Sequence, residues 1–155
     1  MKLATILVPL DGSPLAAAAL PTAVDLAKSF GARLLLLRAA EAPAIRRTDP
    51  SEAQVEVVRE AEAYLDTVKR RLETEGVGDV ETSVWYGPAA SSIAEAAATR
   101  DVSLIVMSTH GRAGLGRLVL GSVAESVLRG TRTPILLVRD GAAPVQVPAA
   151  KARAA

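Results

Sequence analysis

The 155-residue sequence has no cysteine, a single histidine and only four aromatic residues. Without cysteine the chain forms neither a disulfide framework nor a thiolate zinc site. The lone His110 also excludes a multi-histidine metal site within one chain. No stretch approaches the roughly 20 consecutive apolar residues that a membrane-spanning helix needs. We therefore expect a soluble, cytoplasmic protein with no metal bound by its own side chains and no membrane segment.

Neither sign of charge dominates, because 18 basic side chains face 17 acidic ones. Such a balance is not typical of a nucleic-acid-binding surface. Residues 108–139 are the exception, since they carry five arginines against one acid, Glu125, a local excess of +4. We expect an anion to bind in this last third of the chain.

Apolar residues make up half of the sequence and alternate between strand and helix patterns from end to end. Short apolar runs predict strands, and glycine or proline at the ends of 3,4-spaced segments predicts helices between them. The expected strands cover residues 3–8, 33–39, 80–85, 102–107 and 134–138, and the expected helices cover residues 14–29, 51–75, 88–100 and 122–130. Residues 141–155 are rich in alanine and proline and predict a disordered tail after a single domain of residues 1–140.

Strands that alternate with helices predict an α/β fold with one doubly wound, five-stranded parallel sheet and helices on both faces. In the expected order 3-2-1-4-5, the first and fourth strands are neighbours where the strand order reverses. Ligands of such sheets bind at the carboxyl ends of the strands at this switch point. The segments 9–13 and 108–122 should therefore flank one crevice.

The first helix has clear start and stop signals. Ser13 is a preferred N-cap residue, Pro14 suits the first helical position, and Gly31 is a typical stop. Pro21 lies inside this helix and is expected to kink it.

The segment between the fourth strand and the last helix carries the strongest chemical signal. Residues 111–121 include four glycines, and Arg112 and Arg117 add positive charge. Glycines let backbone N–H groups approach a ligand closely, and the start of the next helix offers unpaired N–H groups. This combination favours phosphate binding, while the alternative is a flexible glycine-rich connection.

The named phosphate-binding motifs do not fit this segment. Gly111 and Gly116 have Walker A spacing, but Arg117-Leu118 follows where that motif needs Lys and Ser or Thr. A dinucleotide fingerprint would need a third glycine at Val119, and it would follow the first strand rather than the fourth.

The same segment resembles nucleotide-binding members of the universal stress protein family, which share the pattern G-x-x-G-x(9)-G-[ST]. This chain reads Ser108-x-x-Gly111-x(9)-Gly121-Ser122. The flanking residues 105–112 and 120–129 and the start, Ile6-Leu-Val-Pro-Leu-Asp-Gly-Ser13, are also similar to that family, so the resemblance covers residues 3–139.

Ser108 departs from the family pattern, which has glycine there. If this residue needs a positive φ or lies against the ligand, serine weakens binding. If it has ordinary strand-end geometry, its hydroxyl is able to donate to a phosphate.

The resemblance implies a universal stress protein that binds ATP, with Mg²⁺, as a regulatory ligand in a stress response. It implies that Gly111, Gly121 and Ser122 hold the phosphates with help from Arg112. It also implies that Asp11 and Ala39 hold the nucleoside. The complete implied set is Pro9, Leu10, Asp11, Ala39, Met107, Ser108, Gly111, Arg112, Gly114, Gly116, Gly121, Ser122 and Val123.

The resemblance further implies a homodimer that pairs the fifth strands, Ile135 to Arg139, which would also hide an exposed sheet edge. The competing hypothesis is a dimeric scaffold of the same fold that binds no nucleotide. For Asp11, the alternative to holding the nucleoside is that it only helps to cap the first helix. Trp85 and Tyr86 are able to stack on a base, but an edge-strand surface explains them as well.

Catalysis has less support from the residues. His110 has no second histidine, cysteine or nearby acid in the sequence to orient it, and no base is evident for Ser13 or Ser122. The pyrophosphatase loop S-G-G-x-D-S is absent, and no acid follows the third strand as a phospho-acceptor would require. We expect slow ATP hydrolysis at most.

Overall fold

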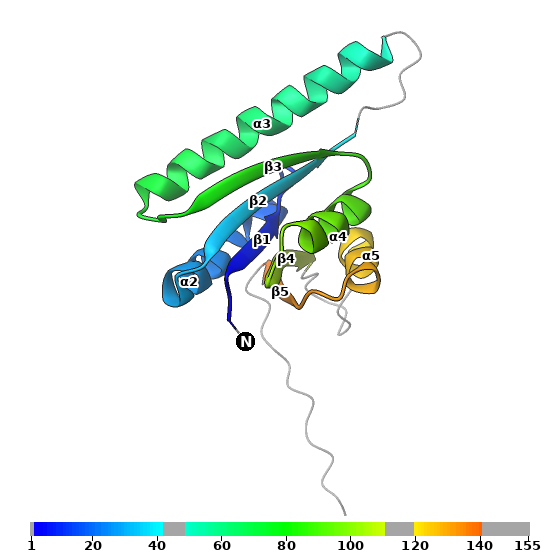
Figure 1. Ribbon diagram of the computed structural model, residues 1–155. Helices are drawn as coiled ribbons and strands as arrows, with labels where there is room; N and C mark the ends of the chain where they lie inside the picture. The colour runs from blue at the N-terminus through cyan, green and yellow to red at the C-terminus, as the bar shows by residue number, and fades with distance from the viewer. Residues whose placement is uncertain (1, 42–48, 111–119, 141–155) are drawn as a thin grey trace, which may run out of the picture.

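The computed structural model describes residues 2–41, 49–110 and 120–140. Its elements are β1 (Thr5–Pro9), α1 (Pro14–Ala17), α2 (Leu20–Phe30), β2 (Arg33–Ala40), α3 (Pro50–Thr74), β3 (Val80–Tyr86), α4 (Ala89–Thr99), β4 (Leu104–His110), α5 (Ser122–Gly130) and β5 (Ile135–Asp140). The strands of this described part form one parallel sheet in the order β3-β2-β1-β4-β5 (Figure 1). The predicted fold and strand order are therefore confirmed, and the predicted tail, 141–155, lies outside the described residues.

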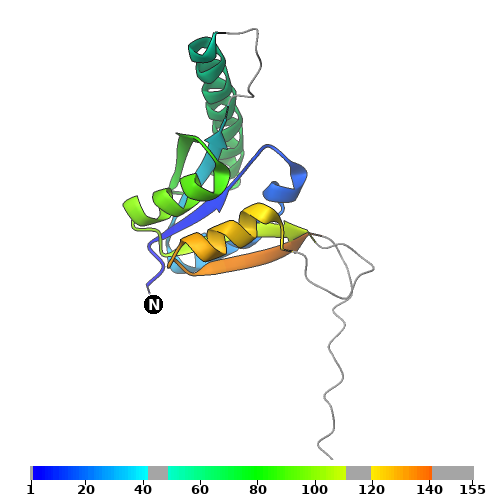
Figure 2. The ribbon, with the colours of Figure 1, turned by 90° about the vertical axis from the view of Figure 1, so that its right-hand side faces the viewer.

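Helices cover both faces of the sheet, and alternate strand residues point into two separate apolar clusters. On one face, buried residues of β1 and β2 such as Ile6 and Leu36 pack with α2 and α3. On the other face, their neighbours Leu7 and Leu35 pack with α4 and α5. Figures 1 and 2 show these two helical layers with the sheet between them. Double coverage explains why the inner strands are almost continuously apolar in sequence.

The predicted first helix is two helices in the structure. Ser13 caps α1 as expected, because its Oγ accepts a hydrogen bond of 3.1 Å from the backbone N of Ala16. α1 ends at Ala17, although the backbone N of Ala18 still donates to the carbonyl of Pro14, and α2 begins at Leu20 with Pro21 in its first turn. Proline has no N–H to donate back to the preceding turn, so Pro21 starts a new helix instead of kinking a continuous one.

β4 is longer at its carboxyl end than the sequence indicated. We expected a loop from residue 108, but β4 continues to His110 because it pairs with β5 from Ile105↔Ile135 to His110↔Asp140. Serine, threonine and histidine at positions 108–110 tolerate extended backbone, and the partner strand supplies the ladder. The glycine-rich connection therefore begins after His110, and its residues 111–119 lie outside the described part of the chain.

The longest helix, α3, begins one residue before its predicted start. Asp49 is its N-cap, with the carboxylate accepting a 2.9 Å hydrogen bond from the backbone N of Ser51, and Pro50 occupies the first helical position. Its apolar stripe of Ala61, Leu65, Val68 and Leu72 is buried on the sheet. Within the described segments, none of the helices combines the length and apolar character needed to cross a membrane.

Leu36 and Leu128 provide a matched test of the core. Leu36 is completely buried between the sheet and its helices, whereas Leu128 on α5 is 54% exposed. We expect Leu36→Ala to lower the free energy of unfolding by about 2–5 kcal/mol, because it removes buried apolar contacts and leaves a cavity. Leu128→Ala should change it by less than about 0.5 kcal/mol. Urea denaturation followed by circular dichroism measures both, and equal losses would contradict this core.

Candidate functional site

The ladder between β1 and β4 ends early. These strands pair only at Ile6↔Leu104 and Leu7↔Ile105, whereas β1 pairs with β2 along all five of its residues. The backbone N of Leu10 donates to the carbonyl of Leu37 on β2 at 2.8 Å. Because successive residues of a strand point their backbone groups to opposite sides, the nitrogen of Pro9 faces β4. Proline has no N–H, so β1 has no donor to offer β4 at this point.

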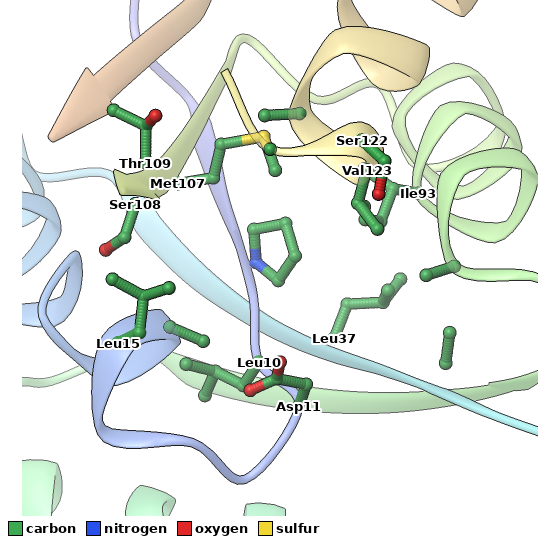
Figure 3. A pocket seen from close by; sticks show the side chains of 16 residues that line it. Leu10, Asp11, Leu15, Leu37, Ile93, Met107, Ser108, Thr109, Ser122 and Val123 are labelled. Atoms are coloured by element: carbon green, nitrogen blue, oxygen red, sulfur yellow. The ribbon is translucent and has the colours of Figure 1, made fainter. Parts of the chain in front are cut away.

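A cavity of about 220 Å³ opens where this ladder ends, at the carboxyl edge of the sheet (Figure 3). It lies at the topological switch point, where doubly wound sheets bind their ligands. Its described walls come from both sides of the sheet, since α1 closes one side and α4 with the start of α5 closes the other. Most of the described lining residues are apolar, and Asp11 is the only charged side chain among them.

Nine of the thirteen residues expected from the family pattern line this one cavity. They are Pro9, Leu10, Asp11, Ala39, Met107, Ser108, Gly121, Ser122 and Val123. The other four, Gly111, Arg112, Gly114 and Gly116, lie outside the described residues. The structure thus brings together the described parts of the two expected segments, which are about 100 positions apart in the chain. That these residues bind a nucleotide stays a prediction.

Seven further residues line the cavity that sequence reasoning did not identify, and all but one are apolar. They are Leu15, Ala16, Leu37, Ala89, Ile93, Thr109 and Ala124. A signal existed for some of them. Leu37 lies two positions before Ala39 and therefore on the same face of β2, and Ala89 and Ile93 lie four apart on one side of α4. Their spacing marks a shared face, but only the assembled sheet shows that the face borders a cavity.

Asp11 sits in a tight turn at the rim of the cavity. Its Oδ1 accepts a hydrogen bond of 2.8 Å from the backbone N of Ser13, which in turn caps α1. Gly12 between them has a φ of +88°, a left-handed conformation that favours glycine. The side chain of Asp11 is exposed and borders the cavity (Figure 3). Asp11 thus orders the turn, while Ser13 provides the side-chain cap of the helix.

Ser108 has ordinary strand geometry. It pairs with Val138 inside β4, and Asp101 is the only non-glycine residue in the described part of the chain with a positive φ. Serine therefore causes no backbone strain at this position. Its Oγ is buried and has no hydrogen-bond partner among the described residues. A buried hydroxyl without a partner costs roughly 1–3 kcal/mol, so the wall of the cavity holds an unmet hydrogen-bonding capacity.

The first turn of α5 forms the opposite wall from Asp11 (Figure 3). Its N-cap is Gly121, which has no side chain to accept from the first N–H groups. Those N–H groups have no partner within the helix, and they carry the positive end of the helix dipole. The cavity therefore has one end that favours an anion, an opposite end with a carboxylate, and an apolar middle.

Trp85 and Tyr86 do not line this cavity. Trp85 packs against the apolar cluster on the α4 face, and its Nε1 donates to Ser83 Oγ at 3.1 Å. Tyr86 is 49% exposed at the end of β3, which is an edge strand as predicted. The surface interpretation therefore fits Tyr86, whereas Trp85 is partly buried against the core.

Residues 3–139 match the Universal stress protein family. The chain belongs to the universal stress protein family. A universal stress protein of Methanocaldococcus jannaschii is 33% identical over 139 residues, which covers 86% of this chain and 81% of that protein. Universal stress protein YxiE of Bacillus subtilis is 32% identical over 145 residues, covering 86% of this chain and 97% of YxiE. Membership explains why the start of the chain and its last third both resembled one family.

Solved structures of universal stress proteins share the fold. UspA from Lactobacillus plantarum superposes with a TM-score of 0.74 at 23% identity, covering 90% of this chain and 99% of that one. A universal stress protein solved in complex with cAMP has a TM-score of 0.69 at 23% identity, covering 89% and 98%. One from Archaeoglobus fulgidus in complex with dAMP has a TM-score of 0.58 at 18% identity, covering 88% and 98%.

Gly12 provides a test of the turn at the rim of this universal stress protein's cavity. The atoms nearest to a Cβ at Gly12 would be those of the Arg38 guanidinium, at ordinary contact distance, so strain at φ +88° is the main cost of Gly12→Ala. We expect a loss of about 1–2 kcal/mol in the free energy of unfolding. Gly78→Ala is the control, because a Cβ there meets nothing within 4 Å and its φ is not positive. Chemical denaturation compares the two, and a neutral Gly12→Ala would contradict the turn.

Proposed function

We propose that this universal stress protein binds ATP, accompanied by Mg²⁺, as a regulatory ligand. The observation that carries the proposal is the polarity of the cavity at the switch point. The uncapped start of α5 favours a phosphate at one end, the Asp11 carboxylate accepts from hydroxyl or amino groups at the other, and apolar residues lie between them. A nucleotide has the same three kinds of surface.

Structural relatives support an adenine ligand. The ligands named for two of the solved universal stress proteins, cAMP and dAMP, share an adenine base. An adenine ring has flat apolar faces and polar edges, and the middle of this cavity offers apolar side chains such as Leu37, Ile93 and Met107. Apolar walls with a few polar groups are the usual composition of small-molecule sites.

The lining residues divide into two groups in this proposal. Asp11 and Ala39, at the ends of β1 and β2, hold the nucleoside. The backbone N–H groups of Gly121 and Ser122 hold phosphate oxygens, whereas Ser108 Oγ, directed toward α1 in Figure 3, is left to bond another polar group of the ligand. The family pattern assigns Gly111, Arg112, Gly114 and Gly116 to the phosphates as well.

Magnesium fits this site as a companion of the nucleotide. Mg²⁺ is usually held by one or two carboxylates together with substrate phosphates and several waters. Asp11 is the only acid among the described lining residues, and the described part of the chain contains no cluster of three or more potential metal ligands. The phosphates of ATP would therefore supply the oxygen ligands for Mg²⁺ that the described side chains do not.

Asp11 already accepts a hydrogen bond that orders its own turn, which favours a role in binding over general-base catalysis.

Nucleotide content and affinity test the proposal directly. Protein purified without added nucleotide is denatured, and any released nucleotide is identified by chromatography. The stripped protein is then titrated with Mg-ATP by calorimetry. We expect stoichiometric nucleotide or a dissociation constant in the micromolar range, about −8 kcal/mol at 1 μM. Neither nucleotide nor heat would favour the scaffold that binds none.

The Gly121→Val variant tests whether Mg-ATP binds at this cavity or elsewhere on the protein. The new side chain projects at the start of α5, where we place the phosphates, so we expect the affinity for Mg-ATP to fall at least tenfold. Gly78→Val is the matched control, since a Cβ at Gly78 meets nothing within 4 Å and the residue does not line the cavity. Equal affinity of both variants would place the binding site elsewhere.

We propose as well that two copies of the chain pair through β5. β5 is an edge strand of the sheet. Among the described helices α5 covers it, and it does so on one face (Figure 2). Leu136, paired in register with Val106, lies on the other face and is 38% exposed. Apolar side chains on an unpaired edge favour association with another strand.

Leu136→Asp tests this dimer. A charge on the exposed face of β5 opposes apolar packing between copies and repels its symmetry mate. We expect sedimentation at micromolar concentration to show a dimer for the wild type and a monomer for Leu136→Asp. Leu128→Asp, at an exposed leucine of α5 away from β5, should remain dimeric. A monomeric wild type would contradict the proposal.

A further inference from the structure

Arg38 links the longest helix to the turn at the rim of the cavity. It follows the buried Leu36 by two residues on β2 and therefore faces α3. Its Cζ lies 5.1 Å from the centroid of the Tyr64 ring on α3, within the range of a cation–π contact. Its Nη1, Cζ and Nη2 lie 3.6–3.7 Å from the place that a Cβ of Gly12 would occupy. These nearly equal distances mean that the guanidinium presents its flat face to Gly12.

Among the described residues, the Tyr64 ring is the group that stabilises the positive charge of Arg38. No carboxylate of the described chain lies within ion-pair distance of it. Partial burial raises the pKa of Tyr64, while Arg38 lowers it and Asp11 raises it. Tyr64 thus lies within electrostatic range of both Arg38 and Asp11, and its raised pKa keeps it neutral at pH 7.

The turn needs support on this side. Its other contacts are the Leu10 to Leu37 backbone bond, the Asp11 carboxylate on the Ser13 N–H, and the Ser13 cap of α1. Gly12 itself has no side chain, and glycine has more backbone freedom than any other residue. A Cβ at Gly12 would only reach ordinary contact distance from Arg38, so the guanidinium lies beside this turn without clashing with it.

We propose that Arg38, stacked on Tyr64, is a positioning residue that holds the Asp11-Gly12-Ser13 turn and so fixes the Asp11 carboxylate at the cavity. Arg38 does not line the cavity and acts through Asp11. The consequence for affinity rests on the proposed nucleotide function, whereas the support of the turn rests on geometry alone. Nucleoside recognition should depend on this pair, and the phosphate end at α5 should not.

Binding of Mg-ATP to variants of the full chain gives the first test. We expect Arg38→Met and Tyr64→Leu to raise the dissociation constant three- to tenfold, the range expected from loss of a cation–π contact. Tyr64→Phe keeps the aromatic ring and should restore most of the affinity lost in Tyr64→Leu. Arg33→Met is the matched control, an arginine of the same strand that pairs with Asp79 and Glu81 at the opposite end of the sheet.

Inorganic tripolyphosphate distinguishes positioning from general destabilisation. It lacks the nucleoside, so its ability to compete with ATP should be equal in Arg38→Met and wild type. A loss of tripolyphosphate and ATP binding by the same factor, together with a lower melting temperature, would overturn the proposal in favour of a purely structural role.

Amide hydrogen exchange tests the turn without nucleotide. The Ser13 and Ala16 N–H groups, which donate to Asp11 and Ser13, should exchange at least threefold faster in Arg38→Met. The Ala4 N–H, bonded to Ser103 at the far end of β1, should keep its rate. If the protein binds no ATP but these N–H groups exchange faster in Arg38→Met, the proposed function fails while the role of Arg38 in holding the turn stands. Unchanged exchange at Ser13 and Ala16 would overturn the proposal even if the protein binds ATP.

Discussion

The parting of β1 from β4 is the constraint on which the site depends. In a parallel sheet covered on both faces, backbone groups at the middle of the sheet normally find partners in the adjacent strands. Pro9 has no N–H to offer β4, and the described ladder between the two strands ends two residues before it. β1 still pairs fully with β2. A defect on one side of a single strand thus opens the sheet where the strand order reverses, and the cavity forms there.

The sequence predicted the sheet well because its signals are local and strong. Apolar runs stopped by Pro9 or Gly31, and the Ser13-Pro14 helix start, each follow from short-range chemistry, and the alternation of strands with helices indicated a parallel sheet covered on both faces. The predicted element boundaries were wrong where packing between elements, and not local sequence, determines where a helix or strand ends. Pro21 begins a second helix after two residues outside any helix, and β4 reaches His110 because β5 lies beside it. Lining residues such as Leu15, Ile93 and Ala124 carry no chemical signal of their own, since only the packed helices bring them to one cavity.

Ser108 shows how a departure from a sequence pattern is judged by geometry. Glycine is irreplaceable where φ is positive or where a side chain would collide, and the strand backbone of Ser108 removes the first reason. What serine adds is a buried Oγ, directed toward Leu15 of α1 in Figure 3 and without a partner in the described part of the chain. Buried polar groups are usually paired, so an unpaired one in a cavity wall is more typical of a site than of a core.

The two ends of the cavity are built by different physical means, and this bears on regulation. The α5 end depends on backbone N–H groups of a helix, which are fixed once the helix forms. The Asp11 end depends on a glycine turn supported by side chains from β2 and α3. A ligand that bridges both ends would join helices from opposite faces of the sheet, and it would stabilise the folded state by mass action. Its stabilising effect would fall more heavily on the turn, because the turn has more freedom to lose, and Arg38 connects the turn to Tyr64 on α3.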